Sequence, residues 1–225
     1  MLEDIEAVIF DLDGTLMSVE ERFYHVFLDT LKMHNLPAVD KDLFMQKFKR
    51  NRLDELIELE DKHAFWIAFL SSYCGAHREL SKVFPGVKET LATLRGAGVK
   101  IGLITGRLCE PEEVLEELHE QGLRNLFDAV VTKKLVVELL KPAELFSRNQ
   151  EIIQVLDKLR TNPARSVLVA DYAEDVKSAK ELGLKTVAVL SGSSDLDELR
   201  RASPDLILKS VNELPIVLGL TDFKS

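Results

Sequence analysis

Six short hydrophobic runs recur along the chain and predict buried β-strands. The first, at residues 7–10, is uninterrupted and rich in β-branched side chains, which is typical of a strand covered on both faces. Similar runs follow at residues 99–104, 129–131, 166–170, 186–190 and, more weakly, 205–208. Between them lie segments with apolar residues at helical spacing, at residues 87–95, 112–120, 150–159 and 173–182. Because strands alternate with helices, the pattern predicts an α/β fold with a doubly wound parallel sheet.

Residues 17–83 follow a different pattern and predict a separate helical unit. Apolar residues recur there at helical spacing, and no run typical of a buried strand interrupts them. Nine of the fifteen aromatic residues of the chain fall in this segment. We therefore expect a core domain of residues 1–16 and 84–225, with a helical domain of residues 17–83 inserted after the first strand. Four aromatic residues are interpreted as the packed interior of this insertion rather than as a surface for stacking substrate: Phe65, Trp66, Phe69 and Tyr73.

The charge balance limits the partners that the surface as a whole can bind. The 225 residues include 29 basic and 38 acidic side chains, for a net charge of −9, which disfavours nucleic acid and anionic membranes as partners. The first residues are acidic where a secretory signal peptide is basic, and no apolar stretch approaches the roughly 18–20 residues that span a bilayer. We expect a soluble, cytoplasmic protein. The sequence gives no indication of the oligomeric state.

The two cysteines show no pattern of a metal site or of a disulfide framework. Cys74 and Cys109 lie 35 positions apart, with no CxxC pair and no histidine at metal-ligand spacing. We therefore expect both cysteines to be reduced thiols in a reducing compartment, and we interpret Cys109 as a structural residue.

Chemically active side chains are expected where the predicted strands end, because open parallel sheets bind ligands beyond the carboxyl ends of their strands. Asp11 and Asp13 follow the first strand two positions apart, so that both side chains can point the same way. Two such acids need a cation, and their hard oxygen atoms suit Mg²⁺, which is readily shared with a phosphate. Asp171 follows the fourth strand, and Asp175 lies one helical turn later.

Groups that bind phosphate are expected at the same edge of the sheet. Thr105 and Gly106 follow the second strand and offer a hydroxyl group and an accessible backbone N–H to a phosphoryl oxygen. Arg107 comes next and fits either a binding or a structural role. Lys141, in the loop region before the next long helix, supplies a compact positive charge that could offset an anionic phosphate.

These motifs resemble those of the haloacid dehalogenase-like (HAD) hydrolases and stand in the order of that family. They are DLDGTL at residues 11–16, ITGR around Thr105, KP at Lys141 and DYAED at residues 171–175. The stretch FPGVKETLATLRGAGVKIGLITG is similar to the phosphoglycolate phosphatase-like branch, whose helical cap domain residues 17–83 match. The resemblance implies a Rossmann-like core and a Mg²⁺-dependent phosphatase. Its substrate would be a small phosphorylated metabolite, such as a phosphoglycolate-like compound or a sugar phosphate.

The resemblance also implies roles for the acids. Asp11 would attack phosphorus and form an aspartyl-phosphate. Asp13 would protonate the leaving oxygen and then take a proton from the water that hydrolyses the intermediate. Mg²⁺ would be held by Asp11, Asp13 through its main-chain carbonyl, and Asp171, with Asp175 in or just outside this set.

Thr105, Gly106 and Lys141 would bind the phosphoryl group through its transition state, under a cap that closes over the site. The chain departs from the usual pattern of the family around Asp171, before Lys141 at residues 133–140, and after KP at Ala143-Glu144. Ala170 stands where glycine is usual, and Tyr172 stands where a small serine or threonine is usual. The bulk of Tyr172 bears on the size of the substrate more than on the type of reaction.

Other functions stay open on the sequence alone. A phosphomutase or phosphotransferase of the same fold would carry much the same motifs. A phospho-accepting signalling protein, or a protein that binds phosphometabolites without turnover, would share the aspartates at the strand ends. A dehalogenase is less favoured, because similar dehalogenases lack the second acid that Asp13 supplies. A basic cluster in residues 17–83 is either a solvated face or a contact for the anionic tail of a substrate: Lys47, Lys49, Arg50 and Arg52.

Overall fold

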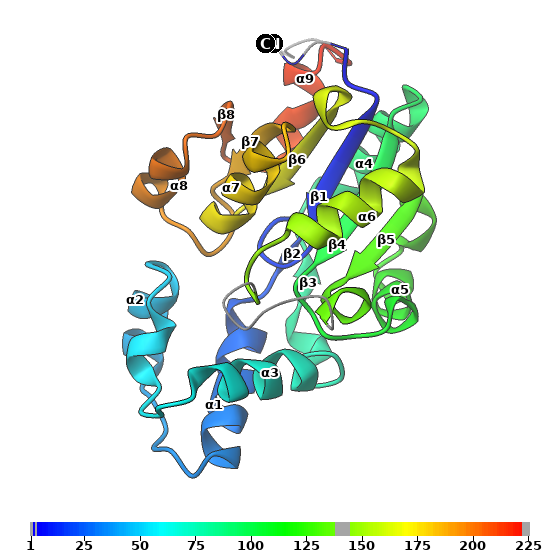
Figure 1. Ribbon diagram of the computed structural model, residues 1–225. Helices are drawn as coiled ribbons and strands as arrows, with labels where there is room; N and C mark the ends of the chain where they lie inside the picture. The colour runs from blue at the N-terminus through cyan, green and yellow to red at the C-terminus, as the bar shows by residue number, and fades with distance from the viewer. Residues whose placement is uncertain (1, 3, 138–144, 222–225) are drawn as a thin grey trace.

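A six-stranded parallel sheet forms the centre of the protein in a computed structural model that describes residues 2, 4–137 and 145–221 (Figure 1). Its strands are β1 (Ala7–Asp11), β4 (Lys100–Thr105), β5 (Ala129–Thr132), β6 (Ser166–Ala170), β7 (Lys185–Val189) and β8 (Leu206–Leu208). They lie in the order β5-β4-β1-β6-β7-β8. Counted along the chain this is the 3-2-1-4-5-6 order of a doubly wound Rossmann-like sheet, with its switch point between β1 and β6. The predicted α/β fold is confirmed.

Helices cover both faces of the sheet, because successive side chains of a strand point to opposite faces. Val8 and Phe10 of β1 belong to the hydrophobic cluster that includes α4, α5 and α9, whereas Ala7 and Ile9 belong to the cluster that includes α6 and α7. The bounds of these helices are α4 (Val87–Gly96), α5 (Pro111–Glu120), α6 (Asn149–Leu159), α7 (Ala173–Glu181) and α9 (Leu214–Val217), and α8 (Leu196–Ala202) packs against α7. No helix of the described residues is both long and apolar enough to cross a membrane.

Residues 17–83, called the helical segment below, lie beyond the carboxyl end of β1 (Figure 1). An antiparallel pair, β2 (Met17–Ser18) and β3 (Lys82–Val83), brings the two ends of the segment together. Between them lie the helices α1 (Glu20–Met33), α2 (Lys41–Phe48) and α3 (Lys62–Ser72). The interior of the segment is aromatic: the ring of Phe27 lies 5.3 Å from the rings of both Phe44 and Phe65, measured between centroids. The division of the chain into two domains at these residues stays a prediction.

A disulfide bond between Cys74 and Cys109 corrects the expectation of two separate reduced thiols. Cys74 follows α3 in the helical segment, and Cys109 lies between β4 and α5 in the core. Their Cα atoms are 5.3 Å apart, within the range that a disulfide requires. No spacing rule applies to two cysteines 35 residues apart. Their proximity arises only because the end of α3 packs beside the loop after β4.

Candidate active site

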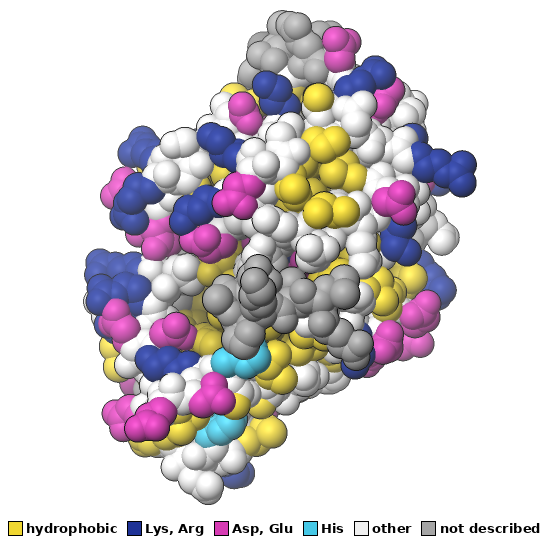
Figure 2. Space-filling view, viewed as in Figure 1, with side chains coloured by type: hydrophobic (Ala, Val, Ile, Leu, Met, Phe, Trp, Pro, Cys, Tyr) yellow, Lys and Arg dark blue, Asp and Glu magenta, His cyan; other side chains and the backbone are white. Residues whose placement is uncertain are grey.

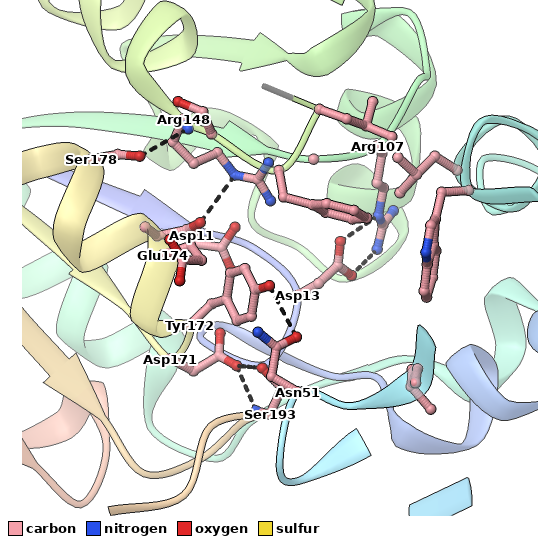
Figure 3. Close-up of a pocket in the computed structure, with 18 of the residues that line it drawn as sticks. Asp11, Asp13, Asn51, Arg107, Arg148, Asp171, Tyr172, Glu174, Ser178 and Ser193 are labelled. Atoms are coloured by element: carbon pink, nitrogen blue, oxygen red, sulfur yellow. Dashed lines mark hydrogen bonds and ion pairs between the residues drawn. The ribbon is translucent and has the colours of Figure 1, made fainter. Parts of the chain in front are cut away.

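The site residues gather where β1, β4 and β6 end, on the side of the sheet that faces the helical segment (Figure 3). Asp11 is the last residue of β1, Thr105 is the last residue of β4, and Asp171 directly follows β6. Gly14 has a positive φ of 89°, and a Cβ atom there would lie 2.5 Å from Oδ2 of Asp171. The loop after β1 can approach Asp171 this closely because position 14 has no side chain.

Three carboxylates, those of Asp11, Asp171 and Asp175, are buried together at this edge. Burial raises the pKa of Asp11 well above its usual range, and the charges of Asp175 and Asp171 raise it further. Burial also raises the pKa of Asp175 to about 6, although the nearby charge of Arg148 opposes this shift. Neither carboxylate oxygen of Asp175 has a hydrogen-bond partner among the described residues. The three acids therefore favour a compensating positive charge.

The carboxylate of Asp171 is held in a fixed orientation by hydrogen bonds. Its Oδ1 accepts a hydrogen bond from the hydroxyl of Thr15 at 3.0 Å. Its Oδ2 accepts from the backbone N–H of Ser193 at 2.6 Å and from the Ser193 hydroxyl at 2.9 Å. Burial raises the pKa of Asp171, and these hydrogen bonds oppose that shift.

Asp13 is engaged by Arg107 instead. Nε and Nη2 of Arg107 donate to the two carboxylate oxygens of Asp13 at 2.8 and 2.6 Å, and the hydroxyl of Thr105 donates to Oδ2 at 3.3 Å. Burial alone would raise the pKa of Asp13, but the charge and hydrogen bonds of Arg107 outweigh it and hold this pKa below its usual range. Asp11 and Asp13 thus lie in opposite electrostatic environments, and without a metal ion Asp11 is the more readily protonated of the two.

A buried chain of ion pairs connects Arg107 to the helical segment. Glu117 of α5 accepts a hydrogen bond from Nη1 of Arg107 at 2.7 Å and another from Nη1 of Arg22 in α1 at 2.8 Å. The guanidinium groups of Arg22 and Arg107 lie 4.3 and 5.0 Å from the ring centroid of Tyr73. The orientation of Asp13 therefore depends on residues from both parts of the chain.

Arg148, which directly precedes α6, reaches the predicted phosphate-binding loop. A Cβ atom on Gly106 would lie 2.4 Å from its Nη2, so the guanidinium lies against the backbone of Gly106. Its Nε lies 3.4 Å from Oδ1 of Asp175, and Figure 3 shows the guanidinium pointing into the site. Nη1 of Arg148 lies 3.6 Å from Glu151, which is itself paired with the buried Lys133 at 2.5 Å. This group places positive charge beside the acids and the Gly106 backbone.

One cavity of about 690 Å³ is lined by these side chains and by the helical segment. Tyr172 also lines it, and its hydroxyl donates a hydrogen bond of 3.0 Å to Oδ1 of Asn51 in the helical segment. The bulky side chain that departs from the usual family pattern thus connects the core to the helical segment at the edge of the cavity. Lys141 lies outside the described residues, so its place in the site stays a prediction.

Comparison with known proteins identifies the family. The family model described as haloacid dehalogenase-like hydrolase matches residues 8–189. The chain belongs to the haloacid dehalogenase-like hydrolases. It is 26% identical over 229 residues to pyrophosphatase PpaX of Halalkalibacterium halodurans, covering 96% of this chain and 98% of that protein. It is also 26% identical to the probable phosphatase IndB of Dickeya dadantii, covering 92% and 90%. The crystal structure of a predicted phosphoglycolate phosphatase from Haemophilus somnus aligns with a TM-score of 0.75 and 22% identity, covering 96% of this chain and 99% of that one.

In this hydrolase the fold brings together most of the side chains predicted from the sequence. Asp11, Asp13, Asp171 and Asp175 all line the cavity, as does Gly106. Thr105, which is fully buried, contacts Asp13 through its hydroxyl. The chemical roles of these residues stay predictions.

The donor chemistry at the sheet edge fits a divalent cation. Asp175 has two buried oxygens without hydrogen bonds among the described residues, and the pKa of Asp11 is raised by burial and by two neighbouring acids. Hard carboxylate oxygens with an excess of negative charge suit Mg²⁺. Within residues 2, 4–137 and 145–221, however, no three acidic, histidine or cysteine side chains are arranged as a ready metal site. Asp11, Asp171 and Asp175 are therefore candidate ligands by chemistry and position, not by ligand geometry.

The basic cluster of the helical segment forms ion pairs, and Lys49 also reaches the core, where its Nζ donates a hydrogen bond of 2.7 Å to the backbone carbonyl of Gly192. Lys47 and Arg52 both pair with Glu55, and Lys49 pairs with Glu20 at 3.1 Å. Neither these three cations nor Arg50 is among the described residues that line the cavity.

Most of the aromatic residues in and directly after α3 both fill the interior of the helical segment and line the cavity. Phe65 is fully buried in the interior of the helical segment, as expected. Trp66, Phe69 and Tyr73 are also buried in that interior, but they line the cavity as well. One face of this aromatic cluster therefore forms a wall of the site.

The site contains two arginines whose roles were not predicted from the sequence. Arg107 was left without a definite role, and Arg148 was not identified at all. Arg107 directly follows Thr105 and Gly106, and this position was a usable signal, although the sequence did not show that it would pair with Asp13. Arg148 carries no motif. Its side chain reaches Gly106 only because α6 begins at the same edge of the sheet.

Proposed function

We propose that this hydrolase is a Mg²⁺-dependent phosphatase that acts on a small phosphorylated substrate through an aspartyl-phosphate. The observation that carries the proposal is the set of four acids, Asp11, Asp13, Asp171 and Asp175, which line one cavity together with Gly106. The family match and relatives named as phosphatases support the same type of reaction.

The two acids would divide the reaction between them. An oxygen of Asp11 would form a bond to phosphorus while the bond from phosphorus to the leaving oxygen breaks, and Asp13 would give that oxygen a proton. A water molecule would then attack the phosphorus of the aspartyl-phosphate, with Asp13 taking its proton, and inorganic phosphate and free Asp11 would be regenerated. The hydrogen bonds from Arg107 favour the ionised form of Asp13, which suits the second step, in which Asp13 accepts the proton from water. For the first step Asp13 would have to take up a proton from solvent, and the pairing with Arg107 opposes that uptake.

Cationic and metal groups would hold the phosphoryl oxygens. Mg²⁺ held by Asp11, the main chain of Asp13, Asp171 and Asp175 would neutralise charge on the phosphoryl group as it transfers. Arg148 lies against Gly106 and is placed to bind a phosphoryl oxygen, and Lys141 is proposed to do the same. The helical segment would act as the cap that excludes water and contacts the leaving group.

Replacement of the nucleophile tests the proposal. We expect Asp11→Asn to lower Mg²⁺-dependent phosphate release from p-nitrophenyl phosphate by at least about a thousandfold. In the absence of metal its melting temperature should be equal to or above that of the wild type, because the change removes a buried charge beside two other acids. Asp157→Asn, on an exposed part of α6, is the matched control and should leave the rate unchanged.

Several outcomes would contradict the proposal. Full activity in Asp11→Asn would exclude this nucleophile, and equal activity after chelation of Mg²⁺ would exclude the metal. Isomerisation of a sugar phosphate without release of phosphate would identify a mutase instead. A phosphorylated protein that persists without turnover would identify a signalling protein.

A further inference from the structure

The helical segment gives the cavity an apolar and largely aromatic wall. Eight residues of the segment make up this wall: the aromatic Phe23, Phe48, Trp66, Phe69 and Tyr73, and the aliphatic Val19, Leu53 and Leu70. They line the same cavity as Asp11 and Asp13, so a substrate whose phosphoryl group reaches Asp11 can extend its leaving group along them. Along the junction between the core and the helical segment, hydrophobic side chains are visible at the surface (Figure 2).

The aromatic side chains of this wall are held in place. The indole N–H of Trp66 donates a hydrogen bond of 2.6 Å to Oδ1 of Asp54. The ring of Trp66 lies 5.4 Å from that of Phe69 at an interplanar angle of 78°. On the side of the core, Phe146 meets Trp66 edge to face with centroids 5.5 Å apart, and Phe146 remains 37% exposed. Fixed rings from both parts of the chain therefore form a preorganised apolar surface.

Positive charge is confined to other parts of the cavity. Three cationic side chains occur among the described residues that line it. Arg107 is bound to Asp13, Arg148 lies against Gly106, and Lys177 pairs with Glu174 at 2.5 Å. The helical segment itself supplies no lining cation within its described residues, and it supplies one acid, Asp54, beside Trp66. A carboxylate or a second phosphate on the leaving group would thus meet no opposite charge along this wall.

We propose that the substrate of this hydrolase is a phosphate ester whose leaving group carries an uncharged aromatic ring, which packs on the wall formed by the helical segment. The inference rests on the proposed phosphatase function and adds the chemical class of the leaving group. The cavity volume of about 690 Å³ is in the range of pockets that hold drug-sized ligands. It exceeds what a phosphoryl group with a two-carbon leaving group requires.

Rates with matched substrates test this class. Benzyl phosphate, cyclohexylmethyl phosphate and ethyl phosphate all release primary alcohols, so differences in leaving-group chemistry are kept small. With Mg²⁺ present, we expect kcat/KM for benzyl phosphate to exceed that for ethyl phosphate by about 10- to 100-fold, from burial of the ring. The kcat/KM for benzyl phosphate should also be higher than that for cyclohexylmethyl phosphate, because edge-to-face contacts favour an aromatic ring over a saturated one. Phosphoglycolate and pyrophosphate should be poorer substrates than benzyl phosphate.

Binding provides a readout that does not depend on turnover. Trp66 is the only tryptophan of the chain, so intrinsic fluorescence reports directly on this wall. In the presence of Mg²⁺, phenylphosphonate should change the Trp66 emission at concentrations about 10- to 100-fold lower than methylphosphonate. Equal affinities for the two phosphonates would overturn the proposal.

A pair of variants tests whether the preference for an aromatic substrate depends on the lining of the cavity. Phe146→Ala removes an exposed ring of the cavity and should lower kcat/KM for benzyl phosphate by about 2- to 10-fold, with ethyl phosphate unchanged. Ile153→Ala is the control: Ile153 is 46% exposed on α6 and does not line the cavity. Equal losses with both substrates in Phe146→Ala would show a structural effect and contradict the assignment.

The two proposals fail in different ways. If phosphoglycolate or pyrophosphate is hydrolysed with a kcat/KM equal to or above that of benzyl phosphate, the proposal of an aromatic leaving group is wrong, whereas the proposed phosphatase activity is retained. If no phosphate ester is hydrolysed but phenylphosphonate still binds selectively at Trp66, the proposed phosphatase activity is wrong, whereas the proposed binding site for an aromatic group is retained.

Discussion

The core and the helical segment are both built around hydrophobic interiors, but of different kinds. The sheet buries mainly aliphatic strands such as β1 and β6, and it carries the acids of the site at their ends. The helical segment buries phenylalanines instead, and one side of its aromatic interior faces the cavity. Under the two proposals above, the core would perform the reaction and the helical segment would select the substrate.

A buried chain of ion pairs also joins these two regions. Arg22 of the helical segment pairs with Glu117 of the core, and Glu117 pairs with Arg107, which holds Asp13. The disulfide between Cys74 and Cys109 lies at the same junction. The position of the helical segment is therefore linked to the orientation of an acid in the site.

The largest stability effect should come from breaking the ion pairs at this junction. Arg107→Ala leaves Glu117 with one partner and Asp13 without its bidentate partner, so we expect the free energy of unfolding to fall by about 3–5 kcal/mol. Phosphatase activity should fall too, because Asp13 loses its orientation. Urea unfolding followed by circular dichroism measures the first effect.

Arg95→Ala is the matched control for Arg107→Ala. Arg95 pairs with Asp128 at 3.1 Å on the exposed surface, and its loss should cost no more than about 1 kcal/mol. Equal losses for the two arginines would show that the buried ion pairs do not hold the junction.

A smaller effect is expected from the disulfide. Reduction of the wild type, or the double change Cys74→Ser with Cys109→Ser, opens a covalent link that closes a 35-residue separation, and it should lower the free energy of unfolding by about 2–4 kcal/mol. Amide hydrogen exchange should increase in α3 more than in β1, because the link joins the helical segment to a core that has its own interior. The double variant should not respond to dithiothreitol. If two free thiols can be titrated in the oxidised wild type, Cys74 and Cys109 do not form a disulfide bond.

The smallest effect concerns the acids of the core and depends on pH. The pKa of Asp175 is raised by burial to about 6, so the folded protein binds this proton more tightly than the unfolded chain does. Its contribution to stability is present at low pH and is lost as the pH rises through 6. Without divalent metal, Asp175→Asn should therefore become more stable than the wild type between pH 4 and 7, by at most about 3 kcal/mol.

Thermal melts across this pH range, with and without Mg²⁺, check the effect of Asp175. Added Mg²⁺ should stabilise the wild type more than Asp175→Asn, and the difference in stability between the two proteins should become smaller. The scan stops at pH 7 because the pKa of Lys133, which burial lowers to about 8, introduces a second titration above it. A difference between the two proteins that does not change with pH would show that the buried charge of Asp175 does not destabilise the fold.

The sequence was sufficient for the sheet because each buried strand is a local pattern. All six strands and the four predicted helices begin and end within one residue of the expected positions. The helices α8 and α9 were not predicted, since seven and four residues are too few to show a helical period. The acids at the strand ends were predictable for the same reason: their positions follow from where a strand stops, and the carboxyl ends of parallel strands share one edge.

Tertiary structure alone decided the contacts between side chains that are distant in the sequence. Arg148 lies against Gly106, Arg107 binds Asp13, and Cys74 meets Cys109, yet none of these contacts is visible in a local pattern. The sequence by itself determined the fold of the core and the acids that it carries, because hydrophobic periodicity is set by neighbours along the chain. The partner of each acid comes from a distant segment of the core, and the aromatic wall opposite depends on how the helical segment packs on the core. Long-range packing decides both.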